Sequence, residues 1–167
     1  LEALKTAYKK GIRLYDTADI YGSGKSEKLL GTIFRYVDDV IICSKVGNRV
    51  KNKKIKFDFI FNYVNASVDK ILYRIKKKRL DILLVHSPPV NFKISKDIQL
   101  LIKNLKKNKI SNFGISFKTV NHAMEVLKDP KQSKYLDYIE IIYNVLDRRA
   151  EKNLFVLAKK RDIKIIA

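Results

Sequence analysis

The sequence predicts an α/β protein whose fold is part of a (β/α)8 TIM barrel. Short, continuously apolar segments alternate with amphipathic helical segments along all 167 residues, a pattern typical of a parallel sheet covered by helices. Neither the GxGxxG motif of dinucleotide-binding folds nor the GxxxxGK[ST] motif of phosphate-binding loops occurs. Six strands and five complete helices between them can be counted, whereas a full barrel has eight strand–helix units. We therefore expect one partial barrel domain over residues 1–167, with pieces missing at both ends.

The first third of the chain supplies the first two strands of this barrel. LEALKTAYKKG reads as an amphipathic helix closed by Gly11, and IRLYDTA is a short apolar strand. A loop with two glycines follows, and apolar residues three and four positions apart predict a helix over residues 25–36. VIICSKV at residues 40–46 reads as a buried strand. The lysine-rich residues 47–56 are expected to form a basic loop.

The remaining elements continue the alternation. Residues 58–78 form the longest predicted helix, because an apolar side chain recurs every three or four positions from Ile60 to Ile75. DILLVH at residues 81–86 is the third strand, stopped by two prolines. The same reasoning predicts helices at residues 97–108, 119–127 and 150–161, and strands at residues 111–116, 138–145 and 163–167. His122 falls within a helix, away from the strand ends, and is expected at the surface.

Composition excludes several classes of protein. Hydrophobic residues make up 46% and aromatic residues 10% of the chain, which argues for a globular protein. No apolar run approaches the roughly 18 residues of a membrane-spanning helix, so no membrane partner is expected. The single cysteine, Cys43, and the lack of a signal peptide favour a cytoplasmic location. The net charge of +19 would suit a nucleic-acid binder. Since the lysines are spread over nearly every segment, no nucleic-acid partner is expected.

Four chemically active side chains follow successive strands. Asp16 ends the first strand and Tyr21 lies in the loop after it, whereas Lys45 ends the second strand and His86 the third. Functional residues of parallel barrels lie at the carboxyl ends of the strands, and neighbouring strands are about 4.8 Å apart. We therefore expect these four side chains around one mouth of the barrel.

This set has the logic of a tuned general acid. A tyrosine with an ordinary pKa near 10 donates protons poorly at neutral pH, but a nearby ammonium favours the phenolate form. Lys45 can supply that charge, Asp16 can keep it ionised, and His86 can point a ring nitrogen at a substrate oxygen. Each residue also has a structural reading: Asp16 as a turn former, Lys45 as an ion-pair partner and His86 as a strand-end histidine. The ligands do not suit zinc, and no metal site is expected.

The same segments resemble the aldo-keto reductases. The N-terminal signature of that family is matched by GIRLYDTADIYGSGKSEKLLG. The strands that end in the lysine and the histidine of the family are matched by ICSKVG and LDILLVHSPP. Two later segments of the family are matched, in the right order and spacing, by KKNKISNFGIS and YIEIIYNVLDRR.

The resemblance implies an oxidoreductase that transfers hydride from NADPH, or less often NADH, to an aldehyde or ketone. It implies that Tyr21 is the general acid, that Lys45 makes its phenol more acidic, that Asp16 supports Lys45 and that His86 orients the carbonyl. Asp16, Ser116 and Glu140 fall at cofactor-binding positions. Two residues depart from the family pattern: Phe117 replaces an asparagine and Glu140 replaces a glutamine that hold the carboxamide of the nicotinamide. A carboxylate accepts hydrogen bonds but donates none.

The resemblance also concerns the extent of the barrel. It implies that the first strand, the eighth strand and the last two helices are absent, together with the residues that hold the adenine end of the cofactor. Residues 1–167 alone are therefore expected to bind NADPH poorly and to be inactive. A second reading is a regulatory or interaction protein that binds NADPH on the same barrel. The carbonyl substrate and the oligomeric state are not predicted.

Overall fold

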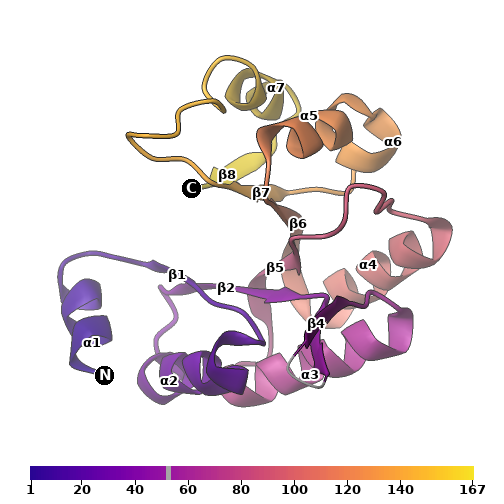
Figure 1. The fold of residues 1–167 in the computed structure, drawn as a ribbon. Helices are drawn as coiled ribbons and strands as arrows, with labels where there is room; N and C mark the ends of the chain where they lie inside the picture. The colour runs from indigo at the N-terminus through magenta and orange to yellow at the C-terminus, as the bar shows by residue number, and fades with distance from the viewer. Residues whose placement is uncertain (52–53) are drawn as a thin grey trace.

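Six parallel strands form one curled sheet, which is the frame of the protein (Figure 1). The computed structural model describes residues 1–51 and 54–167. Neighbouring strands pair in the order β1-β2-β5-β6-β7-β8, and every pair is parallel. Their bounds are Leu14–Asp16 (β1), Ile41–Val46 (β2), Leu80–His86 (β5), Ile110–Phe117 (β6), Tyr138–Ile141 (β7) and Lys164–Ile166 (β8). The predicted partial barrel is thus confirmed.

Helices lie on the outer side of the curl (Figure 1). They are α1 (Glu2–Lys9), α2 (Lys25–Phe34), α3 (Phe61–Ile75), α4 (Lys96–Asn108), α5 (Val120–Lys128), α6 (Pro130–Ser133) and α7 (Leu154–Lys160), and a 3₁₀ turn, η1 (Tyr21–Gly24), precedes α2. Side-chain caps fix several starts, as where Ser95 Oγ accepts the amide of Ile98. The short helix α6 was not predicted. It begins at Pro130, whose fixed φ suits a first helical turn.

Apolar side chains are buried on both faces of the sheet. The larger cluster lies between the strands and the helices. A smaller cluster, made of Cys43, Ile82, Leu84 and Ile166, lies on the inner face. Successive side chains of a strand point to opposite faces. Every second residue of each strand therefore points to the inner face. Near the carboxyl ends of the strands, these inward-pointing residues include the polar side chains.

The predicted basic loop is an antiparallel hairpin in its described part. Strands β3 (Asn48–Lys51) and β4 (Lys54–Phe57) pair with Val50 opposite Ile55, and residues 52–53 of that loop lie outside the described residues. The base of the hairpin is held by aromatic packing, since the Phe57 and Phe59 rings each meet the Phe92 ring edge-on at 5.5 Å between centroids. The many lysines of this segment interrupt the apolar pattern, so the sequence did not reveal that Val50 and Ile55 pair across the two strands.

Two other predictions need correction. The strand predicted over residues 138–145 ends at Ile141, because its pairing with β6 stops at Phe117. His122 is buried, not at the surface. Its ring meets the Phe117 ring edge-on at 5.0 Å between centroids, because α5 packs this histidine against the outer face of β6.

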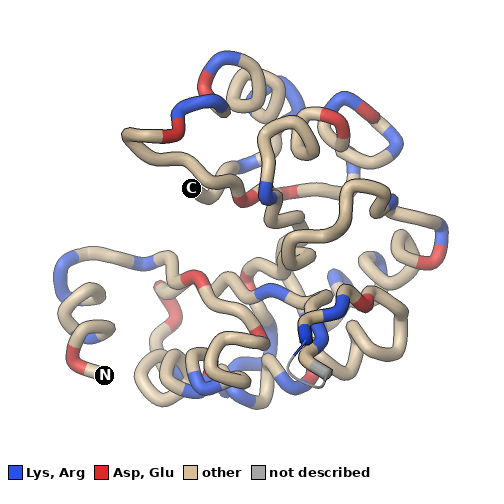
Figure 2. Tube along the Cα trace, viewed as in Figure 1, with Lys and Arg blue, Asp and Glu red and all other residues tan. Residues whose placement is uncertain are grey.

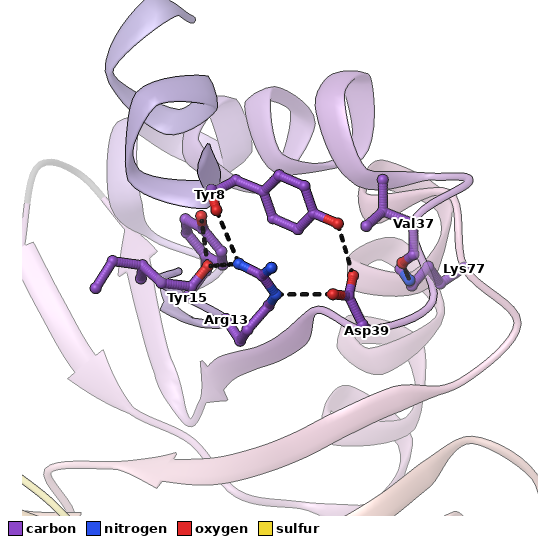
Figure 3. A network of polar contacts seen from close by, with 7 residues as sticks. Tyr8, Arg13, Tyr15, Val37, Asp39 and Lys77 are labelled. Carbon is purple, nitrogen blue, oxygen red and sulfur yellow. Dashed lines mark hydrogen bonds and ion pairs between the residues drawn. The ribbon is translucent and has the colours of Figure 1, made fainter. Parts of the chain in front are cut away.

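A polar network anchors α1 to the loop before β2 (Figure 3). Arg13 Nε donates to Asp39 Oδ2 over 2.7 Å, and the Tyr8 hydroxyl donates to Asp39 Oδ1 over 2.9 Å. The Arg13 guanidinium also lies 4.1 Å from the centroid of the Tyr8 ring. These contacts fix the segment that leads into β1, and so support the strand that carries Asp16.

Positive charge is distributed over most of the chain (Figure 2). Lysines and arginines occur along the helices and on the hairpin. Within the described residues, no helix is both long enough and apolar enough to cross a membrane.

Candidate active site

The predicted site residues gather at one edge of the sheet. Asp16 is paired with Cys43 in register, and two residues further along β2 Lys45 is paired with Leu84. On the other side of β5, register partners place His86 beside Ser116 and Ser116 beside Glu140. These residues stand at the carboxyl ends of five strands: β1, β2, β5, β6 and β7.

Lys45 lies between two carboxylates. Its side chain is 1% exposed, its ammonium forms an ion pair with Asp16, and it lies 3.1 Å from Glu140 Oε2. It also donates to the Thr17 carbonyl over 3.2 Å. Burial alone lowers the pKa of Lys45, but the Asp16 hydrogen bond and the two negative charges outweigh it and raise the pKa above its ordinary value. Lys45 is therefore a buried permanent cation.

Tyr21 is held next to this cation by the turn after β1. Gly22 and Ser23 both adopt left-handed backbone conformations, with φ of 56° and 54°, which turn the chain sharply. The Lys45 ammonium lies 5.6 Å from the centroid of the Tyr21 ring. That ring meets the His86 ring edge-on at 5.8 Å between centroids. The Tyr21 side chain remains partly exposed, and so accessible to a ligand.

His86 is a neutral imidazole at physiological pH. Burial, followed by the positive charge of Lys45, lowers the pKa of His86 to about 4, although Asp16 acts in the opposite sense. Its Nδ1 atom is buried and has no hydrogen-bond partner among residues 1–51 and 54–167. A neutral imidazole offers one donor and one acceptor nitrogen, so His86 can orient a polar oxygen without adding charge to the site.

Glu140 joins the buried lysine to the mouth of the site. Its Oε1 atom accepts from Ser116 Oγ over 2.8 Å, and its Oε2 atom faces Lys45. Burial and the neighbouring Asp16 raise the pKa of Glu140, and Lys45 and Ser116 offset this only in part. The side chain of Phe117, the next residue of β6, is buried on the other face against His122.

A cavity of about 420 Å³ opens over these strand ends. Its lining includes Asp16, Tyr21, His86, Ser116 and Glu140. A larger cavity of about 740 Å³, bounded by α2, α3 and the residues directly after α3, has four lysines among its eight lining residues and contains none of the predicted site residues. The smaller cavity is the candidate active site, because of the two it alone is lined by acidic groups, a phenol and an imidazole that converge from neighbouring strand ends.

One cluster of possible metal ligands coincides with this site. Asp16, Cys43 and Glu140 each place one ligand atom within 4.8 Å of the others. The Lys45 ammonium already contacts both carboxylates, and burial raises the pKa of the Cys43 thiol, which disfavours the thiolate that metals bind. The Lys45 ammonium thus already supplies a positive charge to the two carboxylates of this cluster, and we do not assign a metal to it.

Sequence reasoning missed two carboxylates that flank the site. Glu27 is fully buried and accepts from Ser44 Oγ over 2.6 Å. Its place in the apolar repeat with Leu30, Gly31 and Phe34 was the available signal. Asp19, in the loop before Tyr21, is half-buried, and burial followed by the charge of Glu27 raises its pKa to about 7.

Comparisons with known proteins agree with this geometry. The family described as "Aldo/keto reductase family" matches residues 1–167. An uncharacterized oxidoreductase of Bacillus subtilis, YqkF, is 28% identical over 170 residues, which cover 100% of this chain and 54% of that protein. The NADH-specific methylglyoxal reductase of Escherichia coli is 25% identical over 178 residues, covering 98% of this chain and 53% of that protein.

Solved structures share the fold. The holo form of an aldo-keto reductase from Bacillus halodurans superposes with a TM-score of 0.85 at 27% identity, over 99% of this chain and 55% of that one. An aldo-keto reductase from Klebsiella pneumoniae in complex with NADPH superposes with a TM-score of 0.79 at 19% identity, over 99% of this chain and 55% of that one. The chain spans about half the length of the relatives it matches, and its sequence, register and fold make it a member of the aldo/keto reductase family.

Proposed function

We propose that the full-length protein is an NAD(P)H-dependent oxidoreductase that reduces an aldehyde or ketone, with NADPH as the expected cofactor and Tyr21 as the general acid. The observation that carries this proposal is the buried Lys45 ammonium beside the Tyr21 ring at the mouth of a cavity. A cation at that place stabilises the negative charge that develops on a phenol as it gives up its proton.

The other residues complete the proposed chemistry. Asp16 keeps Lys45 ionised through their ion pair. His86, neutral at pH 7 and in edge-on contact with Tyr21, donates a hydrogen bond to the carbonyl oxygen and so aims it at the phenol. The carbonyl oxygen then takes the Tyr21 proton while the carbonyl carbon takes the hydride. The substrate gains one positive and one negative charge, so the alcohol product carries no added charge.

The residues present fit the nicotinamide end of the cofactor. The Glu140 carboxylate would accept from the N–H of the nicotinamide carboxamide, and the Ser116 hydroxyl, which donates to the same carboxylate, would hold it in place. Asp16, Ser116 and Glu140 would hold this end within the cavity that they line. When bound, the cofactor supplies the hydride. The family relationship and the Escherichia coli relative, which is NADH-specific by name, support either form of the nucleotide. We also infer a small carbonyl substrate and a cytoplasmic location, which the single cysteine supports.

The proposal is tested by mixing the full-length protein with NADPH and a panel of simple aldehydes and ketones. We expect loss of NADPH absorbance, and a decrease in rate of about 10²–10⁴-fold in Tyr21→Phe. Tyr36→Phe is the matched control, because Tyr36 is 81% exposed and lies outside the cavity lining. If no carbonyl consumes NADPH although NADPH binds, the regulatory reading is favoured. If Tyr21→Phe retains its rate, another residue is the acid.

A further inference from the structure

A lysine at the mouth of the candidate active site has no part in the proposed chemistry. Lys118 directly follows β6 and lines the cavity of about 420 Å³ together with Tyr21 and His86. Its side chain is exposed. Burial and then Lys45 are the main causes that lower the pKa of His86, and the charge of Lys118 acts in the same sense. A group bound at Lys118 would therefore lie close to the carbonyl that His86 orients.

Lys118 is an unpaired cation in the part of the chain that the structure describes. Asp16 and Glu140 also line the cavity, but both contact the Lys45 ammonium. Among residues 1–51 and 54–167, no carboxylate lies within ion-pair distance of the Lys118 ammonium. An uncompensated positive charge in a concave site attracts an anionic group of a ligand.

Ser87 supplies a hydroxyl on the adjacent segment. It directly follows β5, lines the same cavity and has a left-handed backbone with φ of 48°. Strained positions of this kind cluster at ligand sites. The Ser87 amide donates to the Ser116 carbonyl over 3.0 Å, and His86 is paired in register with Ser116. Ser87 and Lys118 therefore lie just beyond the paired ends of two neighbouring strands.

We propose that Lys118 and Ser87 form a carboxylate-binding subsite, and that the carbonyl substrate of the full-length protein is an aldehyde or ketone that also carries a carboxylate group. This inference rests on the proposed function. The two residues determine specificity and take no part in the transfer of the proton or the hydride.

The donor set suits a carboxylate. An ammonium and a hydroxyl can both donate to carboxylate oxygens, and charge-assisted hydrogen bonds are the stronger kind. One lysine balances the single charge of a carboxylate. A phosphate monoester carries a charge of about −1.5 to −2 at pH 7, part of which would stay unbalanced in a cavity that Asp16 and Glu140 also line.

The spacing of the strands limits the length of the substrate. His86 ends β5 and Lys118 follows β6, and neighbouring strands are about 4.8 Å apart. A compact acid, with its carbonyl and its carboxylate separated by a few carbons, would reach both residues. It would also leave room in the cavity for the nicotinamide end of the cofactor.

The first experiment compares two substrates of the full-length protein that share one aldehyde and differ in charge. These are 4-oxobutanoate and its uncharged methyl ester, at saturating NADPH. In Lys118→Met we expect the ratio of kcat/KM for the acid to that for the ester to fall about 5- to 20-fold, because a charge-assisted contact is lost at an exposed site. Ser87→Ala should lower the ratio less, and Lys118→Arg should restore it. High salt should lower it in the wild type.

A lysine outside the cavity provides the matched control. Lys128 is exposed at the end of α5 and does not line the cavity, so Lys128→Met should leave the ratio unchanged. An equal ratio in wild type and Lys118→Met would overturn this inference. An equal loss for acid and ester with a raised KM for NADPH would also overturn it, since Lys118 would then bind the cofactor. A greater loss in Lys118→Met for glyceraldehyde 3-phosphate than for 4-oxobutanoate would show that the subsite takes phosphate instead.

The second experiment needs no catalysis. Proton–nitrogen NMR of the full-length protein, with the His86 ring signals assigned by their loss in His86→Asn, follows a titration with butanoate at pH 7. We expect a saturable change in the His86 signals with butanoate, none with butanamide, and a weaker response in Lys118→Met. An equal response in Lys118→Met would overturn the subsite. A wild-type protein that reduces no carbonyl would overturn the proposed function instead, and the butanoate titration would still test the subsite.

Discussion

The Glu27 carboxylate on α2 is completely buried and lies 2.8 Å from the Arg74 guanidinium on α3. Ser44 on β2 donates to the other oxygen of Glu27 over 2.6 Å. One acidic side chain thus joins two helices and the strand that carries Lys45. Because burial of an unpaired charge is costly, this contact ties the outer layer of helices to the candidate active site.

Glu27→Ala should strongly destabilise the fold. It leaves the Arg74 guanidinium and the Ser44 hydroxyl without their partner, and loss of one member of a buried pair costs about 3–5 kcal/mol. Urea denaturation measures the loss. Glu151→Ala is the matched control, since Glu151 pairs with Arg148 at the surface, and its effect should be much smaller. Equal effects in the two variants would show that the Glu27 pair is not coupled to the core.

Gly31→Ala should separate α2 from α3. A Cβ atom at this helical glycine would lie 2.2 Å from the Arg74 carbonyl oxygen and 2.8 Å from the Ile75 backbone, so the helices must move apart. Overpacking of this kind costs about 1–3 kcal/mol or more. Thermal unfolding checks the prediction. Leu29→Ala changes an exposed position of the same helix and should lower the melting temperature less; the reverse order would contradict the close helix contact.

Asp19→Asn should stabilise the protein at pH 8 and have little effect at pH 4. Burial raises the pKa of Asp19 to about 7, whereas the unfolded chain ionises near its ordinary value. Between these limits the native state binds more protons, so Asp19 lowers stability as pH rises from about 4 to about 7. After allowance for its partial exposure we expect a gain of about 1–2 kcal/mol at pH 8. Urea denaturation of both proteins at the two pH values measures it.

His86 makes stability depend on pH in the opposite sense to Asp19. This contribution is the same in Asp19→Asn and in the wild type, so it cancels in the difference between them. The lowered pKa of His86, about 4, means that the unfolded chain binds more protons between about pH 4 and 6.5, so the wild type gains stability there as pH rises. The Asp19 contribution is therefore read from the difference between variant and wild type at each pH. A difference that does not change with pH would show that Asp19 is ionised in the native state throughout.

Lys45→Met should raise the pKa of His86. Burial still lowers that pKa, but the next cause, the positive charge of Lys45, is gone, and Asp16 and Glu140 are left uncompensated. We expect the pKa to move from about 4 toward its ordinary value. Proton–nitrogen NMR of the two histidines measures it, and His122, packed against Phe117 on the other side of β6, is an internal control. An unchanged His86 titration would contradict the effect of the Lys45 charge on the His86 pKa.

The strand ends that carry the site could be predicted from the sequence. Apolar segments that stop at Asp16, Lys45 and His86 are local patterns, and the parallel sheet brings the ends of such segments to one edge. The pairing of residues 48–51 with residues 54–57 could not be predicted in this way, because both strands are short and the exposed Lys54 and Lys56 interrupt the apolar pattern. His122 was misplaced because helical periodicity says which residues share a face, but not what that face packs against.

The sequence by itself determined the alternation of strands and helices, the order of Asp16, Tyr21, Lys45 and His86, and the family to which the chain belongs. Hydrophobic periodicity and motif spacing depend on residues that are close together in the chain, so they can be recognised without coordinates. Only the tertiary structure decided that Glu140 reaches Lys45, that Glu27 is buried against Arg74, and that His86 is neutral. Burial and charge–charge distances depend on residues far apart in the chain, and these set the electrostatics of the site.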